Sequence, residues 1–196
     1  LWGTPTYFWS KHKRTNFNWW RKRIQRQYEL MDLLRLDHFR GLAGYWRVNG
    51  NSETAIHGKW IHSPGRTLLK KLKKDIKADY LPIIAEDLGV ITPDVEKLRN
   101  DFQLPGMKIL QFAFDGNEDN PYLPKNIKEE NWVVYTGTHD NATSISWWKS
   151  LDKDSKIKIK DEYKFSENPS WDLIEIGMKT NANLFIAPIQ DILCLD

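Results

Sequence analysis

Residues 80–101, YLPIIAEDLGVITPDVEKLRND, join a short apolar run to an acidic pair and then to the start of a helix. The continuous run LPIIA is typical of a strand that is covered on both faces. Thr92 as a helix cap, with Pro93 at the first helical position, predicts a helix within residues 91–101. The stretch therefore predicts a strand, a short loop and a helix, which is the repeating unit of an α/β protein.

The same alternation recurs along the chain. Apolar runs predict further strands at 33–36, 107–114, 131–141 and 182–193. Periodic apolar residues predict helices at 16–32 and 63–78, and a solvated helical segment up to about residue 164. We therefore predict the α/β class, with a sheet that is covered on both faces.

Composition excludes several classes of protein. With 40% hydrophobic residues among 196, the chain has enough apolar material for a core and is not expected to be disordered. The 29 basic and 26 acidic residues are mixed along the chain, so we expect neither a nucleic-acid nor a membrane partner. The single Cys194 cannot form an intramolecular disulfide, which favours a reducing compartment such as the cytoplasm.

Both ends of the sequence look cut. The chain begins LWGTP without an initiator Met, and it ends APIQDILCLD inside an apolar stretch. We therefore expect a fragment of a longer chain.

Acidic residues follow three of the predicted strands. The pairs are Asp37–His38, Glu86–Asp87 and His139–Asp140. Because active sites of parallel sheets and barrels lie at the carboxyl ends of the strands, these pairs are candidate site residues.

The first pair lies in LLRLDHFRG, residues 33–41. Alternate residues of a strand share a face, so Arg35 and Asp37 are predicted to be neighbours. A nearby guanidinium lowers the pKa of a carboxyl, which suits a nucleophile or an electrostatic stabiliser. A structural ion pair is the alternative.

Glu86 follows the apolar run LPIIA, where desolvation would raise its pKa towards that of a general acid. The alternative is that Glu86 or Asp87 caps the next loop. Asp140 lies in THDN, which is also a plausible turn. Two carboxyls about 5–5.5 Å apart would indicate retaining glycoside chemistry, and about 6.5–9.5 Å would indicate inversion.

A metal site is the competing interpretation of these carboxylates and histidines. The sequence contains no HxH or HExxH motif, and neither GxGxxG nor GxxxxGK[ST] occurs. We therefore predict no metal and no nucleotide cofactor.

Several longer motifs occur in order: LRLDHFRG, IIAEDLGVITPDVEKLR, LPGMKILQFAF, NPYLP and VVYTGTHDN. In these motifs the chain resembles the 4-α-glucanotransferases, also called amylomaltases or disproportionating enzymes. The resemblance implies part of a (β/α)8 TIM barrel related to the α-amylases, without its N-terminal strands and its C-terminal end. A complete barrel needs about 250 residues.

The resemblance also implies an activity: transfer of α-1,4-glucan segments between maltooligosaccharides by a retaining double displacement through a covalent glycosyl-enzyme, without cofactor. Asp37 would be the nucleophile, Glu86 the general acid/base and Asp140 the transition-state stabiliser. Substrate-binding roles are implied for Arg35, which would orient Asp37, and for His38, His139, Trp2, Tyr45 and Phe112. Core packing is the alternative for the three aromatic residues.

The Gly-rich, aromatic loop 41–62 is our candidate for a lid over the site. An α-glucan hydrolase on the same scaffold and an inactive, glucan-binding fragment are the alternative functions. We expect a cytoplasmic protein, or a plastid stromal one in a plant. The sequence leaves the oligomeric state open.

Overall fold

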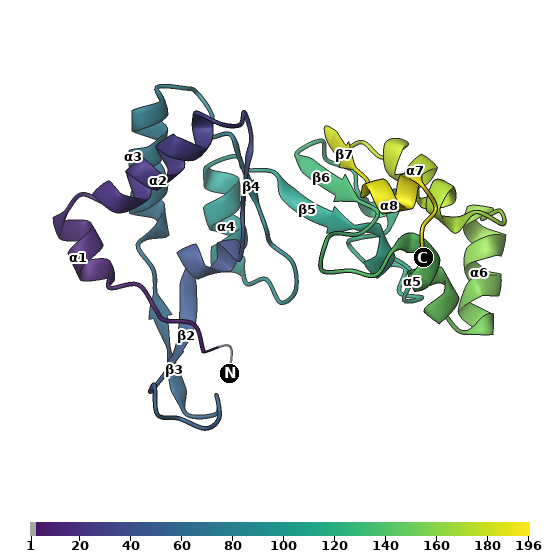
Figure 1. The fold of residues 1–196 in the computed structure, drawn as a ribbon, viewed down its shortest axis with the longest axis horizontal. Helices are drawn as coiled ribbons and strands as arrows, with labels where there is room; N and C mark the ends of the chain where they lie inside the picture. The colour runs from purple at the N-terminus through teal and green to yellow at the C-terminus, as the bar shows by residue number, and fades with distance from the viewer. Residues whose placement is uncertain (1–2) are drawn as a thin grey trace. The chain divides into compact units, whose positions relative to one another are not determined.

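The computed structural model describes residues 3–196, which form two compact units (Figure 1). The first unit ends at Pro105, and the second runs from Gly106 to Asp196. Trp2, one of the predicted substrate-binding residues, lies outside the described residues. The two units are described separately.

The first unit combines a parallel strand pair, a hairpin and helices. In chain order it contains α1 (Trp9–Arg14), α2 (Asn18–Tyr28), β1 (Leu34–Leu36), the 3-10 helix η1 (Phe39–Leu42), β2 (Gly44–Val48), β3 (Gly58–His62), α3 (Gly65–Ile76), β4 (Ile83–Ala85) and α4 (Pro93–Asp101). β1 and β4 are parallel, and Leu36 pairs with Ala85 at their carboxyl ends. The chain positions of Asp37 and Glu86 therefore follow two adjacent strand ends.

The predicted strand within 80–89 is confirmed, although only three of its residues are strand. All three residues of β4 are buried, as expected for a strand covered on both faces. α2 and α3 lie side by side and contribute much of the core around β4 (Figure 1). Their buried apolar side chains are Trp20, Ile24, Leu68, Leu69 and Leu72.

α4 begins at Pro93, as predicted, and Thr92 has extended backbone angles at the cap position. The Thr92 side chain makes no capping bond to the helix. Its hydrogen bond goes to the Asp94 carboxylate instead, and this bond lowers the pKa of Asp94. The start of the helix was therefore predicted correctly, but the role of the Thr92 hydroxyl was not.

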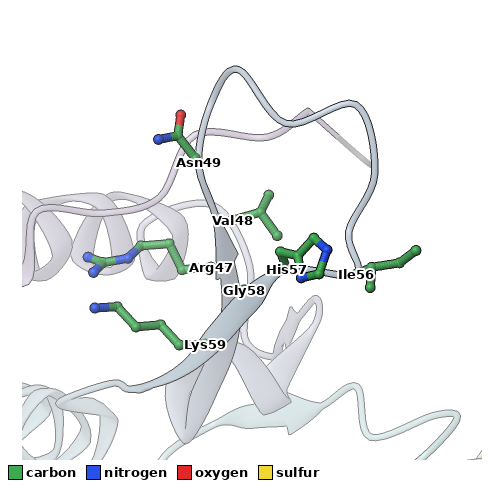
Figure 2. A pocket seen from close by; sticks show the side chains of 7 residues that line it. All are labelled: Arg47, Val48, Asn49, Ile56, His57, Gly58 and Lys59. Carbon is green, nitrogen blue, oxygen red and sulfur yellow. The ribbon is translucent and has the colours of Figure 1, made fainter.

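Residues 41–62 are mostly a β-hairpin and not an irregular loop. β2 and β3 pair antiparallel, with Trp46 opposite Trp60. The hairpin lies at one end of the first unit, and its tip is shown in Figure 2. Aromatic and β-branched residues in the two short runs GYWRV and GKWIH favour strands, and this signal outweighs the glycines.

The second unit contains a three-stranded parallel sheet. In chain order it contains β5 (Gly106–Ile109), the 3-10 helices η2 (Leu110–Phe112) and η3 (Pro124–Asn126), β6 (Trp132–Tyr135), α5 (Ser144–Ser150), α6 (Lys153–Tyr163), α7 (Pro169–Met178), β7 (Leu184–Ile186) and α8 (Ile189–Ile192). The strand order is β5-β6-β7 (Figure 1). Val134 of β6, Ile159 of α6 and Leu173 of α7 belong to one buried cluster, so helices cover this sheet.

Among the described residues, three α-helices were not predicted: α1, α7 and α8, the last of which lies within the predicted strand at 182–193. α1 is six residues long and buries none of them, so it has no apolar periodicity to detect. α7 had a detectable start signal, because Asn168 caps the N–H of Trp171 and Pro169 occupies the first turn.

The α/β class is confirmed by these parallel strands and their helices. The described residues form three separate sheets and no closed barrel, so the partial barrel stays a prediction. Within residues 3–196, none of the helices has the length and apolar character needed to cross a membrane.

Candidate active site

Arg35 and Asp37 are neighbours, as the alternation along the strand predicts. Nη1 of Arg35 lies 2.8 Å from Oδ1 of Asp37. The Asp37 side chain is 74% exposed, whereas that of Arg35 is 27% exposed. The partly buried guanidinium therefore holds one carboxylate oxygen, and the carboxylate remains accessible to a ligand.

His38 turns the chain away from β1 immediately after Asp37. Its φ and ψ of 47° and 52° lie in the left-handed region, which is unfavourable by roughly 1–2 kcal/mol for a residue with a side chain. Such conformations persist where surrounding contacts enforce them, and they concentrate at functional sites. Because β1 ends at Leu36, both Asp37 and His38 lie beyond the strand.

Glu86 is fixed by its neighbours on both sides of the strand pair. Its Oε2 accepts a hydrogen bond from the backbone N–H of His38 at 2.7 Å, and its Oε1 accepts one from that of Leu88 at 3.0 Å. The predicted loop-capping bond is therefore present. The same carboxyl also binds the backbone of His38, the residue that follows Asp37. This hydrogen bond therefore links the chain segments that carry the two candidate catalytic residues.

Asp87 differs from Glu86 although the two are adjacent. Oδ2 of Asp87 lies 2.5 Å from Nη1 of Arg99, and both side chains are buried. A buried, paired carboxylate of this kind has a structural role. The pair anchors the segment after β4 to α4, whereas Glu86 is only partly buried.

In the second unit, Asp140 lies in a tight turn after β6. The N–H and hydroxyl of Thr138 both donate to Oδ1 of Asn141, so the predicted turn is present. His139 and Asp140 lie at its exposed tip, with Nε2 of His139 3.4 Å from Oδ2 of Asp140. The turn presents both side chains to solvent and to any ligand.

The sequence analysis missed the residues that support this turn. The buried side chain of Gln111 donates to the carbonyl of Ala142 at 3.0 Å. A Cβ at Gly137 would lie 2.7 Å from Nε2 of Gln111, so the glycine allows this close approach. Asp191 is a buried carboxylate bonded to Thr136 and Ser144. Only the lone Gly between two threonines was a detectable signal.

Two of the predicted aromatic contacts lie within the described residues. Tyr45 is half-buried on β2, opposite Ile61. Phe112 is 43% exposed in η2, with its ring edge-to-face against Tyr122 at a centroid distance of 5.6 Å. Both side chains are partly exposed, so neither is fully buried in the core.

An open hollow of about 520 Å³ lies at the tip of the β2–β3 hairpin (Figure 2). It is lined by Arg47, Val48, Asn49, Ile56, His57, Gly58 and Lys59. None of the predicted site residues lines it. Elsewhere within residues 3–196, no group of three or more His, Cys, Asp or Glu side chains is arranged to hold a metal ion.

Accessible carboxylates at the ends of parallel strands, one held by an arginine, are typical of enzymes that act on glycosidic bonds with pairs of carboxyl groups. The family model described as 4-alpha-glucanotransferase matches residues 1–196, and the chain belongs to this family.

Named relatives agree with this assignment. The chain is 46% identical over 197 residues to a 4-alpha-glucanotransferase from Synechocystis sp., covering 100% of this chain and 39% of the relative. It is 42% identical to one from Thermus thermophilus, and the match covers 99% of this chain and 40% of the relative. It is 44% identical to a chloroplastic/amyloplastic one from Arabidopsis thaliana, and the match covers 100% of this chain and 34% of the relative. The chain thus spans well under half the length of these relatives.

Solved structures resemble the chain as well. The amylomaltase from Streptococcus agalactiae in complex with acarbose has a TM-score of 0.91 and 35% identity, covering 100% of this chain and 39% of that one. The amylomaltase from Corynebacterium glutamicum shows a similar fold, with a TM-score of 0.75 at 16% identity. This match covers 96% of this chain and 32% of that one. The predicted family is confirmed.

Proposed function

We propose that the protein transfers segments of α-1,4-linked glucan between maltooligosaccharides through a covalent glycosyl-enzyme. Family membership over residues 1–196 carries this proposal. The pairing of β1 with β4, whose paired ends are followed directly by Asp37 and Glu86, supports it from the structure. The acarbose complex of the Streptococcus agalactiae amylomaltase supports an oligosaccharide as ligand.

In this mechanism Asp37 attacks the anomeric carbon, and a bond forms between its carboxylate oxygen and that carbon. Glu86 gives its proton to the glycosidic oxygen, which leaves with the bonding electrons as a free hydroxyl. In the second step Glu86 takes the proton of the 4-hydroxyl of an acceptor sugar. The acceptor oxygen bonds to the anomeric carbon, and the Asp37 carboxylate is released.

We assign the remaining residues to binding. Arg35 keeps the Asp37 carboxylate ionised and oriented, and the 2.8 Å pair supports this role. Asp140 binds sugar hydroxyls and stabilises the transition state. His38, His139, Tyr45, Phe112 and Trp2 contact the glucan. No cofactor is required, because acid, base and nucleophile all come from side chains.

The proposed lid is the β2–β3 hairpin. Trp46 and Trp60 are 40% and 55% exposed, and their rings lie 5.7 Å apart on one face of it. A glycosyl-enzyme reacts with sugar in preference to water only if water is excluded. Large exposed aromatic rings near a glucan would exclude water, which supports a role for this hairpin in favouring transfer.

The proposed compartment is the cytoplasm or, in a plant, the plastid stroma. The chloroplastic/amyloplastic relative from Arabidopsis thaliana supports the second case. The scaffold as a partial (β/α)8 barrel is proposed with the function, and the parallel strands found within each unit support it.

The test is product analysis of maltotriose incubated with the protein at its natural length. A ladder of longer oligomers supports transfer, whereas glucose and shorter sugars alone would show a hydrolase. If a folded protein forms no product, the result favours the alternative of an inactive, glucan-binding fragment. The same assay on residues 1–196 expressed alone shows whether this part of the chain is active.

Asp37→Asn should lower the transfer rate by about 10³-fold or more, because the nucleophile is lost. Asp79→Asn is the matched control, since Asp79 is exposed in a bend between α3 and β4, is not one of the proposed site residues, and should leave the rate unchanged. Wild-type transfer by Asp37→Asn would show that the nucleophile is another residue.

A further inference from the structure

Asp191 in α8 is a carboxylate with 1% exposure. It accepts three hydrogen bonds. Oδ2 accepts from Oγ1 of Thr136 at 2.5 Å and from Oγ of Ser144 at 2.7 Å, and Oδ1 accepts from the backbone N–H of Ser144 at 2.7 Å. All three donors are neutral groups. Burying a carboxyl group is costly unless its oxygens are hydrogen-bonded, so this arrangement calls for an explanation.

The chain positions of the two donor residues, Thr136 and Ser144, explain this arrangement. Thr136 directly follows the last residue of β6, and Ser144 is the first residue of α5. The seven residues between them, 137–143, are the turn that carries His139 and Asp140. One buried carboxylate therefore ties together the two ends of the segment that holds Asp140.

The tip of the segment is closed on itself by the hydrogen bonds between Thr138 and Asn141, whereas the contacts to the rest of the unit lie near its ends. The Asp140 side chain is 71% exposed, and its backbone N–H makes a 3.3 Å bond to Thr138. Near the ends, by contrast, Gln111 holds the carbonyl of Ala142 and the Thr143 hydroxyl caps Ser146. The location of Asp140 thus depends on how the ends are fixed.

We propose that Asp191 is a positioning residue that fixes the 137–143 turn and thereby places Asp140 for transition-state binding. The expected effect of Asp191 on activity rests on the proposed function. Asp191 does not touch the glucan in this proposal. Its effect passes through Asp140, because the carboxylate binds the two residues that flank the turn.

Three variants test the proposal in the protein at its natural length. Asp191→Ala removes all three acceptors and should lower kcat for maltotriose disproportionation by about tenfold or more, with a smaller change in KM. Asp191→Asn should recover most of this loss, since its amide oxygen can still accept from the N–H of Ser144 and its NH₂ can donate to both hydroxyls. Ser170→Ala is the control, because Ser170 is buried in the same unit, its hydroxyl has no hydrogen-bond partner among residues 3–196, and kcat should not change.

A double-mutant cycle separates positioning from general stability. If Asp191 acts through Asp140, Asp191→Ala should reduce kcat much less in an Asp140→Asn protein than in the wild type. Independent, additive losses would overturn the proposal, as would a wild-type kcat for Asp191→Ala.

Amide hydrogen exchange distinguishes failure of this proposal from failure of the proposed function. Asp191→Ala should increase exchange in residues 137–143 without increasing it in α2 or α3. If the wild type makes no transfer products, the proposed function fails, and the exchange result still decides whether Asp191 fixes the turn. Unchanged exchange in residues 137–143 would show that Asp191 does not fix this turn.

Discussion

The backbone N–H of His38 donates to Oε2 of Glu86 at 2.7 Å, and His38 adopts a left-handed conformation to do so. The residue after the proposed nucleophile therefore binds the proposed acid/base. The hydrogen bond links the ends of β1 and β4 beyond the last paired residues, Leu36 and Ala85. Together with the backbone bonds from Glu86 N–H to Leu36 and from Phe39 N–H to Glu86, this strained position sets where the two carboxylates lie.

This position predicts an unusual order of stabilities for His38 variants. His38→Gly should be more stable than His38→Ala by about 1 kcal/mol, because glycine adopts positive φ without steric cost. Urea unfolding at neutral pH measures the difference. Both variants should lose transfer activity, since both lack the imidazole. Equal stability of the two would show that the left-handed conformation is not populated in solution.

The ion pair at Asp37 predicts that Arg35 is not replaceable by lysine. Arg35→Lys keeps the positive charge but loses the planar guanidinium that holds the carboxylate at 2.8 Å. We expect kcat/KM for maltotriose to fall by roughly tenfold. Arg26→Lys is the control, because Arg26 pairs with Glu29 on the exposed surface of α2. An unchanged kcat/KM for Arg35→Lys would assign the pair a structural role only.

The sequence predicted the elements that depend on local signals. The period of two along 33–37 placed Arg35 beside Asp37, and the apolar run before Glu86 gave a buried strand. The hairpin was missed although GYWRV and GKWIH favour strands, because the glycines of 41–62 suggested a loop and the pairing of Trp46 with Trp60 joins residues 14 apart. Asp191 was missed for the same reason, since its partners lie 47 and 55 residues away.

The proposed lid predicts a change in reaction partition. Trp60→Ala removes an exposed ring of the hairpin that lies over the Arg40 guanidinium at 4.8 Å. If the hairpin excludes water, free glucose release should rise several-fold relative to chain elongation. Quantitative product analysis of a maltotriose reaction measures both. Trp171→Ala, at a similarly exposed Trp in α7, should leave the ratio unchanged. A wild-type ratio for Trp60→Ala would exclude this residue from the lid.

The contact between α2 and α3 predicts an acid-dependent stability. Nε and Nη2 of Arg21 donate to the two oxygens of Asp75, and these hydrogen bonds lower the pKa of Asp75. Because the folded pKa lies below the unfolded one, the pair stabilises the fold above about pH 4, and this is lost as the pH falls through the folded pKa.

Asp75→Asn should therefore reduce the free energy of unfolding by about 0.5–1 kcal/mol at pH 7 and by less near pH 2.5. Urea unfolding at the two pH values measures this difference. Asp79→Asn, at an exposed Asp in the same unit, should change stability little at either pH. A loss for Asp75→Asn that is the same at both pH values would contradict a role of the ion pair.

Gly137 predicts a steric effect on the turn that carries Asp140. A Cβ at this position would lie 2.7 Å from Nε2 and 3.1 Å from Cδ of Gln111, which is held by its bond to Ala142. Gly137→Ala should therefore destabilise the protein by about 1–3 kcal/mol and lower kcat, because either Gln111 or the turn must move.

Gly50→Ala is the matched control, since a Cβ at Gly50 meets no atom within 4 Å, and its effect on stability should stay within about 0.5 kcal/mol. The clash with Gln111 is tested by the double variant Gly137→Ala/Gln111→Ala. Truncation of Gln111 opens the space, so Gly137→Ala should cost less in that background than in the wild type. An equal cost in both backgrounds would place the constraint on Gly137 elsewhere, and Asn141, whose Cβ would lie 3.3 Å away, would then be the residue to vary.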